Sequence, residues 1–247
     1  DLHSFPTRRS SDLHIESGGW NGRGAVPHAA VSFLPFGPEK VWSYEGGFKS
    51  QFLGDTMRLN ATLFWADVTD LQLTSGVTNP SGGVIFLTQN TGEGRFRGAE
   101  IEWQWLPLNE LNIYASLGLM DAAYTSIKPQ PQTQVTLASQ PVRSPDVTGN
   151  LGLIYTIPAP GGNFSLSGDA SFTSDHWVAV SNTPASAHVQ SRWLYQAQLG
   201  YQTDSGQWSA SLGCKNCGDE EYITSWFFGP YFGDPRTWEL RLSHRFN

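Results

Sequence analysis

The sequence predicts an all-β protein that forms part of a transmembrane antiparallel β-barrel. Three observations support this prediction. Apolar and polar residues alternate along nine long segments, the connections between these segments alternate between short and long, and aromatic residues gather near both ends of the apolar faces. A soluble sheet would instead place its aromatic residues at mid-strand, where burial is deepest.

The alternation is clearest in the last segment, Arg236 to Asn247, where every second residue is apolar or aromatic except His244. Side chains alternate across a strand, so this segment has one apolar face and one polar, charged face. The same pattern, with Phe64 as a misfit, predicts strands whose apolar-face residues fall within 42–48, 59–65, 99–105, 111–119, 147–155, 164–172, 193–201, 208–214 and 238–246.

The predicted connections differ in length in a regular way. Short connections follow Leu53, Leu106, Ile157 and Gln202, and long ones follow Leu73, Met120, Thr173 and Cys217. Antiparallel strands that cross a membrane place alternate connections on opposite sides. Short turns on one side and long loops on the other are typical of outer-membrane barrels, in which the long loops face outward.

Aromatic residues form two rows on the apolar faces when the strands are aligned with the short turns at the bottom. The lower row comprises Trp103, Trp105, Tyr155, Phe164, Tyr201, Trp208 and Phe246, and the upper row comprises Trp42, Trp65, Phe172, Trp193 and Trp238. Between the rows the apolar face is mostly aliphatic or glycine. Amphipathic rings favour the membrane–water interface, so the two rows indicate the two edges of a bilayer.

Composition excludes several other classes of protein. No apolar run approaches the roughly 18 residues that a membrane helix needs, and a net charge of −7 argues against nucleic acid as a partner. The two cysteines, Cys214 and Cys217, are too few for a disulfide framework. Positions i and i+3 of a strand face opposite ways, and no further zinc ligands lie nearby, so we interpret the cysteines as small packing residues and predict no metal site.

Four stretches, in this order, resemble motifs of TonB-dependent outer-membrane receptors. Residues 38–49 (PEKVWSYEGGFK) resemble P-E-x-x-x-x-Y-E-x-G-x-K, and Asn90 with residues 97–100 (RGAE) resembles N-x-G…G-x-E. Residues 215–222 (KNCGDEEY) resemble N-L-x-D-x-x-Y, and Pro235–Arg236 with Phe246 resemble the closing strand. Two positions depart from the family pattern, because Cys217 replaces an apolar residue and Asn247 follows the usual terminal aromatic.

The resemblance implies a barrel of about 22 strands with a plugged lumen, of which this chain supplies the last nine. The N-terminal plug domain would then be encoded upstream. Residues 5–13 (FPTRRSSDL) resemble a translated sequencing adapter. We therefore expect 1–13 to be an artefactual tail, 14–37 a remnant of an extracellular loop, and 38–247 the C-terminal barrel strands.

The resemblance also implies a function: an active-transport receptor of the bacterial outer membrane that imports a scarce, bulky nutrient, in the first place a ferric siderophore. Its partners would be membrane lipid, the metal chelate and, through the plug, the energising TonB complex. Iron would arrive as cargo, so no cofactor is expected. The alternatives are a cobalamin or oligosaccharide cargo, a passive porin, or an outer-membrane enzyme. No G-x-S-x-G occurs, and we predict no catalytic residues.

Large aromatic residues in the long loops are the candidate site. Exposed aromatics are costly unless they pack or bind, so two interpretations are open: the loops pack on themselves, or they contact an aromatic iron chelate. The candidate ligand-binding residues are Trp20, Arg23, His176, Trp177, Trp226, Phe227, Phe228 and Tyr231.

Overall fold

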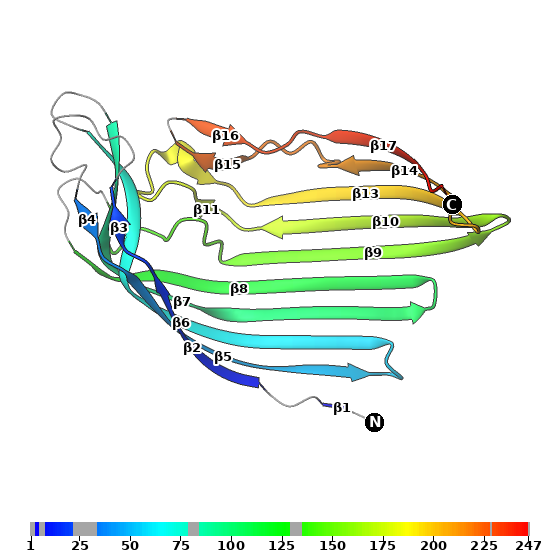
Figure 1. Cartoon of the computed structure of the whole chain (residues 1–247), viewed down its shortest axis with the longest axis horizontal. Helices are drawn as coiled ribbons and strands as arrows, with labels where there is room; N and C mark the ends of the chain where they lie inside the picture. The colour runs from blue at the N-terminus through cyan, green and yellow to red at the C-terminus, as the bar shows by residue number, and fades with distance from the viewer. Residues whose placement is uncertain are drawn as a thin grey trace.

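The computed structural model describes residues 3–4, 8–21, 34–78, 84–128, 135–227 and 229–246. Its main feature is an antiparallel sheet of 11 strands (Figure 1). The strands of this sheet are β1 (His3–Ser4), β2 (Arg8–Glu16), β5 (Glu39–Phe52), β6 (Met57–Thr78), β7 (Val84–Leu108), β8 (Leu111–Ile127), β9 (Val147–Ala159), β10 (Gly162–Thr173), β13 (Arg192–Thr203), β14 (Trp208–Lys215) and β17 (Thr237–His244).

Three short pairs lie outside the main sheet. They are β3 (Gly19–Trp20) with β4 (Pro35–Phe36), β11 (His176–Trp177) with β12 (His188–Val189), and β15 (Ile223–Trp226) with β16 (Pro230–Phe232). Helical structure in the described ranges is confined to the 3-10 turn η2 (Ala185–Ala187). None of the described segments forms a helix with the length and apolar character needed to span a membrane.

The nine predicted strands are confirmed. They are β5 to β10, β13, β14 and β17, and each pairs with the next in chain order. Figure 1 shows the short turns together at one end of the sheet and the long connections at the other. Three of the short turns place a glycine at positive φ, among them Gly161 at 84° and Gly206 at 65°, where other residues would be strained.

The two faces of the sheet differ as predicted. Mid-strand leucines on the apolar face are exposed, for example Leu63 at 68% and Leu240 at 70%. Such a surface would be unstable in water and is suited to lipid. Rings of the upper row (Phe172 with Trp193) and lower row (Phe164 with Tyr201) lie on neighbouring strands, with centroids 5.1 and 4.8 Å apart.

Two residues that broke the predicted pattern have structural explanations. His244 belongs to the lower aromatic row, because its ring lies 4.2 Å from that of Trp208 and 4.4 Å from that of Phe246. Phe64 faces the polar side, where its ring lies over Gly98; a Cβ there would collide with the ring and with the carbonyl of Leu119. Gly98 therefore makes room for Phe64.

Strand β2 was not predicted. It covers residues that the sequence analysis assigned to a tail and a loop remnant, and it pairs with β5 from Arg8 opposite Gly47 to Glu16 opposite Glu39. The outer edge of β5 presents unpaired backbone groups, and an extended segment can complete its ladder. Leu13 then lies opposite Trp42 on the apolar face.

Predicted strand ends at the long-loop side were wrong. The segments 74–83 and 121–144 were expected to be loops, but β6 continues to Thr78 and β8 continues to Ile127. Strand β7 begins at Val84, well before the alternation predicted at 99–105. Their side chains explain the difference, because Ile85 and Leu87 are only 1% and 2% exposed. The strands continue because their upper ends pack into a small buried core above the upper aromatic row.

Candidate functional site

The long-loop end of the sheet carries a layer of packed loops. One cluster of buried residues joins the upper parts of β6 and β8 to the loop after β8 and comprises Val68, Leu71, Leu73, Tyr124 and Val135. Val180, from the connection between β10 and β13, packs against the same cluster. Two loops and two strands are therefore held together by one buried cluster. Burial in this cluster raises the pKa of Tyr124 to about 12.

A network of hydrogen bonds holds β6 within this layer at the point where its regular pairing with β7 is interrupted. Asp70 has a φ of 55°, and the β6–β7 register shifts beside it. The Asn90 Nδ2 group donates to the carbonyls of Asp70 (2.6 Å) and Gly37 (3.0 Å), while Asn90 Oδ1 accepts the Gly37 N–H at 2.6 Å. Asn90, one of the motif residues, thus ties β7 to the segment before β5.

Glu39, another motif residue, belongs to the same hydrogen-bond network and lies above the upper aromatic row. Its Oε2 accepts the backbone N–H of Gln72 at 2.7 Å, and the Gln72 side chain donates to the carbonyl of Gly37 at 3.1 Å. Burial raises the pKa of Glu39, and the Gln72 N–H partly opposes that effect. Two motifs that lie far apart in the sequence meet here.

Three of the candidate residues are used in loop packing. Trp177 and Trp226 pack against a second buried cluster, formed by Val178, Ala187 and Val189. The Trp177 ring also lies 4.7 Å from that of His188. His176 is buried, with Nδ1 3.0 Å from the carbonyl of Ser174. This cluster connects the β10–β13 loop to the β14–β17 loop.

Three other candidates remain exposed at the surface of the layer: Trp20 at 74%, Phe227 at 51% and Tyr231 at 56%. Phe232, beside Tyr231, is 66% exposed. Phe227 stacks on Phe86 of β7, with ring centroids 4.5 Å apart and planes 14° apart. Arg23 and Phe228 lie outside the described residues.

Asn21 holds Trp20 in place and was missed by the sequence analysis. Its side chain donates to the carbonyl of Thr88 at 2.9 Å and accepts the Thr88 N–H at 2.6 Å, as a neighbouring strand would. A single asparagine in a polar segment carries no sequence signal for such a contact. Trp20 and Phe227 are therefore both supported by the upper part of β7, through Thr88 and Phe86.

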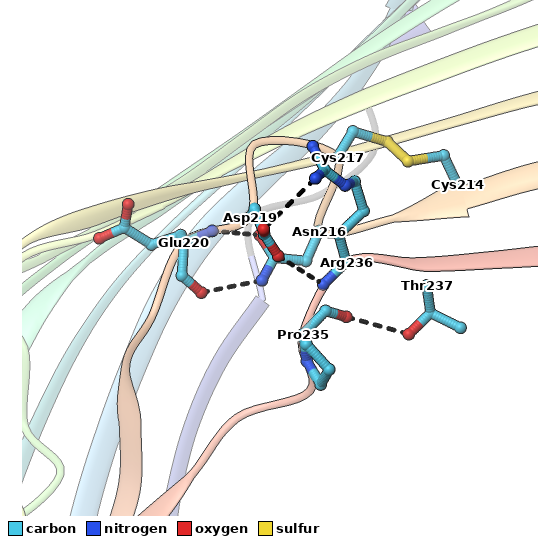
Figure 2. The surroundings of a disulfide bond; sticks show 8 residues. All are labelled: Cys214, Asn216, Cys217, Asp219, Glu220, Pro235, Arg236 and Thr237. Carbon is cyan, nitrogen blue, oxygen red and sulfur yellow. Dashed lines mark hydrogen bonds and ion pairs between the residues drawn. A yellow bond between two sulfur atoms is a disulfide. The ribbon is translucent and has the colours of Figure 1, made fainter.

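A disulfide closes the tight turn at the start of the last long loop, which corrects the prediction for the cysteines. Cys214 and Cys217 are bonded to each other, with Cα atoms 5.6 Å apart (Figure 2). The prediction assumed a continuous strand, but β14 ends at Lys215 and Asn216 adopts a φ of 46°. The turn brings Cys217 back toward Cys214.

The side chains of Asn216 and Asp219 form hydrogen bonds that join the two ends of the same loop. The Asn216 side chain accepts the Glu220 N–H at 3.0 Å and donates to the carbonyls of Glu220 and Asp234 at 2.9 and 3.0 Å. Asp219 accepts the backbone N–H of Arg236 at 3.0 Å and pairs with its guanidinium at 3.3 Å (Figure 2). The loop that presents Phe227 and Tyr231 is thus anchored at its base.

The polar face of the sheet contains a hollow of ≈ 510 Å³. Its lining includes Tyr114, Asp169, Gln196, Lys215, Glu239 and Arg241. The Tyr114 hydroxyl donates to Asp169 at 3.2 Å, and Arg241 pairs with Glu239 at 2.6 Å. Among the described residues, no group of three or more His, Cys, Asp or Glu side chains is placed to hold a metal ion. This face offers hydrogen bonds and charges of both signs along the strands.

An antiparallel meander with a lipid-suited outer face, a polar inner face and long loops at one end defines a section of an outer-membrane-type β-barrel. Residues 14–217 match the family model described as TonB dependent receptor-like, beta-barrel. The chain belongs to this family, and the resemblance drawn from the four motifs is confirmed.

Solved structures with a similar fold include receptors named for ferric chelates. The ferric yersiniabactin uptake receptor FyuA of Yersinia pestis superposes with a TM-score of 0.72 at 17% identity, over 95% of this chain and 33% of that one. BauA, the ferric preacinetobactin receptor of Acinetobacter baumannii, gives 0.69 at 20% identity, over 96% and 34%. The ferric-catecholate import receptor Fiu of E. coli K12 gives 0.67 at 20%, over 97% and 33%. The chain spans about one third of the length of these receptors.

Proposed function

We propose that the receptor to which this chain belongs binds a ferric siderophore on the outside of the bacterial outer membrane and imports it with energy delivered through TonB. The iron arrives as chelated cargo, and no bond is made or broken in the cargo by this part of the chain. The observation that carries the proposal is the match of nearly the whole chain to receptors whose names specify ferric chelates.

The loop layer supports the same proposal by its chemistry. Phe227 and Tyr231 present exposed rings from an anchored loop, and the hollow on the polar face lies on the side that a closed barrel turns toward its lumen. Aromatic rings stack on planar aromatic groups, and many iron chelators contain such groups. His176, Trp177 and Trp226 support the loops from within.

Uptake by the whole receptor tests this proposal. Cells that lack the gene and cells that express it would be supplied with a panel of ⁵⁵Fe-siderophores, with labelled cobalamin and with a labelled oligosaccharide. We expect receptor-dependent accumulation of one ferric siderophore that stops when TonB is absent. Uptake of cobalamin or oligosaccharide instead would contradict the cargo, and uptake independent of TonB would indicate a passive pore.

Alanine substitution of two loop rings tests the loop site, and the measurement is binding of the same ⁵⁵Fe-siderophore to the cells. Phe227→Ala with Tyr231→Ala should weaken ferric siderophore binding by about tenfold, since each aromatic contact contributes about 0.5–1.5 kcal/mol. Phe164→Ala removes a ring from the lower aromatic row and is the control. If the loop variant binds cargo as tightly as the control, the site residues are wrong.

A further inference from the structure

A charged cluster lies on the apolar face of the sheet, where charges are otherwise rare. It comprises Trp65 and Asp67 of β6, Arg95 and Arg97 of β7, and Asp121 of β8, and is called the Arg97 cluster below. The register places Trp65 opposite Arg97 and Arg97 opposite Asp121, with Asp67 opposite Arg95. These five side chains therefore share one face.

The level of the cluster follows from the row beneath it. Leu63, Ala99 and Leu119 are paired with one another on the same face, and Leu63 and Leu119 are 68% and 41% exposed. Trp65 belongs to the upper aromatic row. The Arg97 cluster thus stands where the aliphatic band ends, at the depth of lipid headgroups on the long-loop side.

The two guanidinium groups are held in fixed positions. They lie over the Trp65 ring, with Cζ of Arg95 at 4.9 Å and Cζ of Arg97 at 5.4 Å from the centroid. Arg97 donates to Asp121 Oδ2 from Nε (2.8 Å) and Nη2 (2.6 Å), and Arg95 donates to Asp67 from Nε at 3.4 Å. Trp65 itself donates to Asp67 at 2.8 Å.

Several donors of the cluster remain available. A guanidinium has five N–H groups; within the described part of the chain Arg97 uses two of them and Arg95 one. Both side chains are partly exposed, at 47% and 42%. A planar pair of N–H groups fits two oxygens of a phosphate.

A groove of ≈ 500 Å³ runs beside Arg97. Its lining joins Leu63, Ala99 and Leu119 to the charged residues Arg97, Asp121 and Asp146. An apolar floor with a charged rim matches an amphiphile that has an acyl chain below and a polar headgroup above.

We propose that the Arg97 cluster binds the phosphate of a lipid headgroup in the outward-facing leaflet, with an acyl chain of the same lipid in the adjoining groove. This inference rests on the membrane placement in the proposed function. With Asp146 in the groove lining, the three carboxylates (Asp67, Asp121 and Asp146) outnumber the two guanidinium groups, so recognition must come from directed hydrogen bonds and the apolar floor. Asp121 positions Arg97 and competes with the phosphate for it.

The test measures lipid binding to the whole receptor in detergent by native mass spectrometry. The probe is a lipid with a bis-phosphorylated diglucosamine headgroup, and its dephosphorylated form and inorganic phosphate are the comparisons. We expect Arg95→Gln with Arg97→Gln to weaken binding by about tenfold or more, to the level of the dephosphorylated lipid. Millimolar inorganic phosphate should not displace the lipid, since it lacks the acyl contact.

Two further variants separate recognition from stability. Lys128→Gln is the matched control, because Lys128 pairs with Asp70 at 3.1 Å with similar exposure, 55% and 48%, and does not line the groove. Asp121→Asn removes the competing charge and should bind the phosphorylated lipid at least as tightly as the wild type. If Asp121→Asn weakens binding as the arginine variant does, or if dephosphorylation changes nothing, the lipid site is refuted.

Failure of this inference can be told apart from failure of the proposed function. Each protein is first tested for insertion, by heat-modifiable migration on a gel, and for uptake of ferric siderophore. A receptor that inserts and imports iron without phosphate-dependent lipid binding refutes the Arg97 site alone. A wild type that does not insert refutes the membrane placement itself.

Discussion

Single polar side chains at the loop end of the sheet satisfy backbone groups that the strand ladders leave without partners. Glu39, Asn90 and Asn216 each bond to backbone atoms that lie 33, 53 and 18 positions away along the chain. Buried backbone groups without hydrogen bonds are costly. All three residues belong to stretches that resemble the family motifs, so these motifs fix the loop layer and need not touch the cargo.

Glu39→Gln should preserve the hydrogen bond from Gln72 and remove a half-buried charge. Because burial raises the pKa of Glu39 above its ordinary 4.5, the charged carboxylate is the less favoured form in the fold. The variant should therefore unfold at the same or a slightly higher temperature than wild type at pH 7. Below pH 4.5, where the carboxyl is protonated in both states, the difference should vanish.

The control for this prediction is Glu39→Ala, which loses the bond to Gln72 and should cost about 1–2 kcal/mol. Thermal unfolding of the whole receptor across a pH series measures all three proteins. A Gln variant as unstable as the Ala variant would show that the charge of Glu39 is required.

Leu117→Arg tests the assignment of the two faces. Leu117 lies mid-strand on the apolar face, 38% exposed, so an arginine there should cost about 2–4 kcal/mol of insertion free energy. Thr148→Arg, on the polar face of neighbouring β9, should cost far less. Folding titrations of the whole receptor in lipid vesicles compare the two, and equal penalties would mean that the faces are misassigned.

Residue patterns predicted the faces because alternation is a local property of each strand. Contacts that depend on distant segments could not be predicted in this way. Asn21 meets Thr88 across 67 positions, and the Cys214–Cys217 bond depends on the turn at Asn216. The exposed and packed roles of the loop aromatics likewise depend on how separate loops meet.

At the scale of elements, the nine predicted strands, their order and the positions of the short turns were predicted correctly, whereas β2 was not predicted. Each short turn connects strands that the alternation already delimits, and three of them contain a glycine at positive φ. The long-loop ends were wrong because the β6–β7 and β8 extensions are stabilised by tertiary packing, around Ile85, Leu87 and Tyr124.

The orientation of the strands predicts which connections a reagent can reach on intact cells. Ala138 lies in a long loop and Asp204 in a short turn, and both are exposed. In the whole receptor, Ala138→Cys should react with a bulky thiol reagent that does not cross the membrane, and Asp204→Cys should react only after the cells are opened. The native cysteines are bonded to each other and should stay silent. The reverse pattern would invert the assigned orientation.

At the scale of the whole molecule, no second layer covers the sheet within the part of the chain that the structure describes. Its apolar face is exposed along the strands, and its opposite face carries polar and charged residues such as Asp169 and Glu239. A soluble sheet protein would bury its apolar face against another sheet or helices. The arrangement is stable only when lipid covers the apolar face and neighbouring strands complete the barrel.

Expressed alone, residues 14–247 should therefore aggregate or be degraded. Strand β17 is an open edge of the sheet. Open edges are not tolerated in hydrocarbon, and the barrels of this family close so that no edge remains. Joined to the rest of the receptor, the same residues should give a species that migrates differently on a gel before and after heating, as closed barrels do. Size-exclusion chromatography, thermal melts and gel shifts distinguish these outcomes. A monomeric, soluble form of residues 14–247 that melts cooperatively would contradict the barrel and favour a sheet that packs on itself in water.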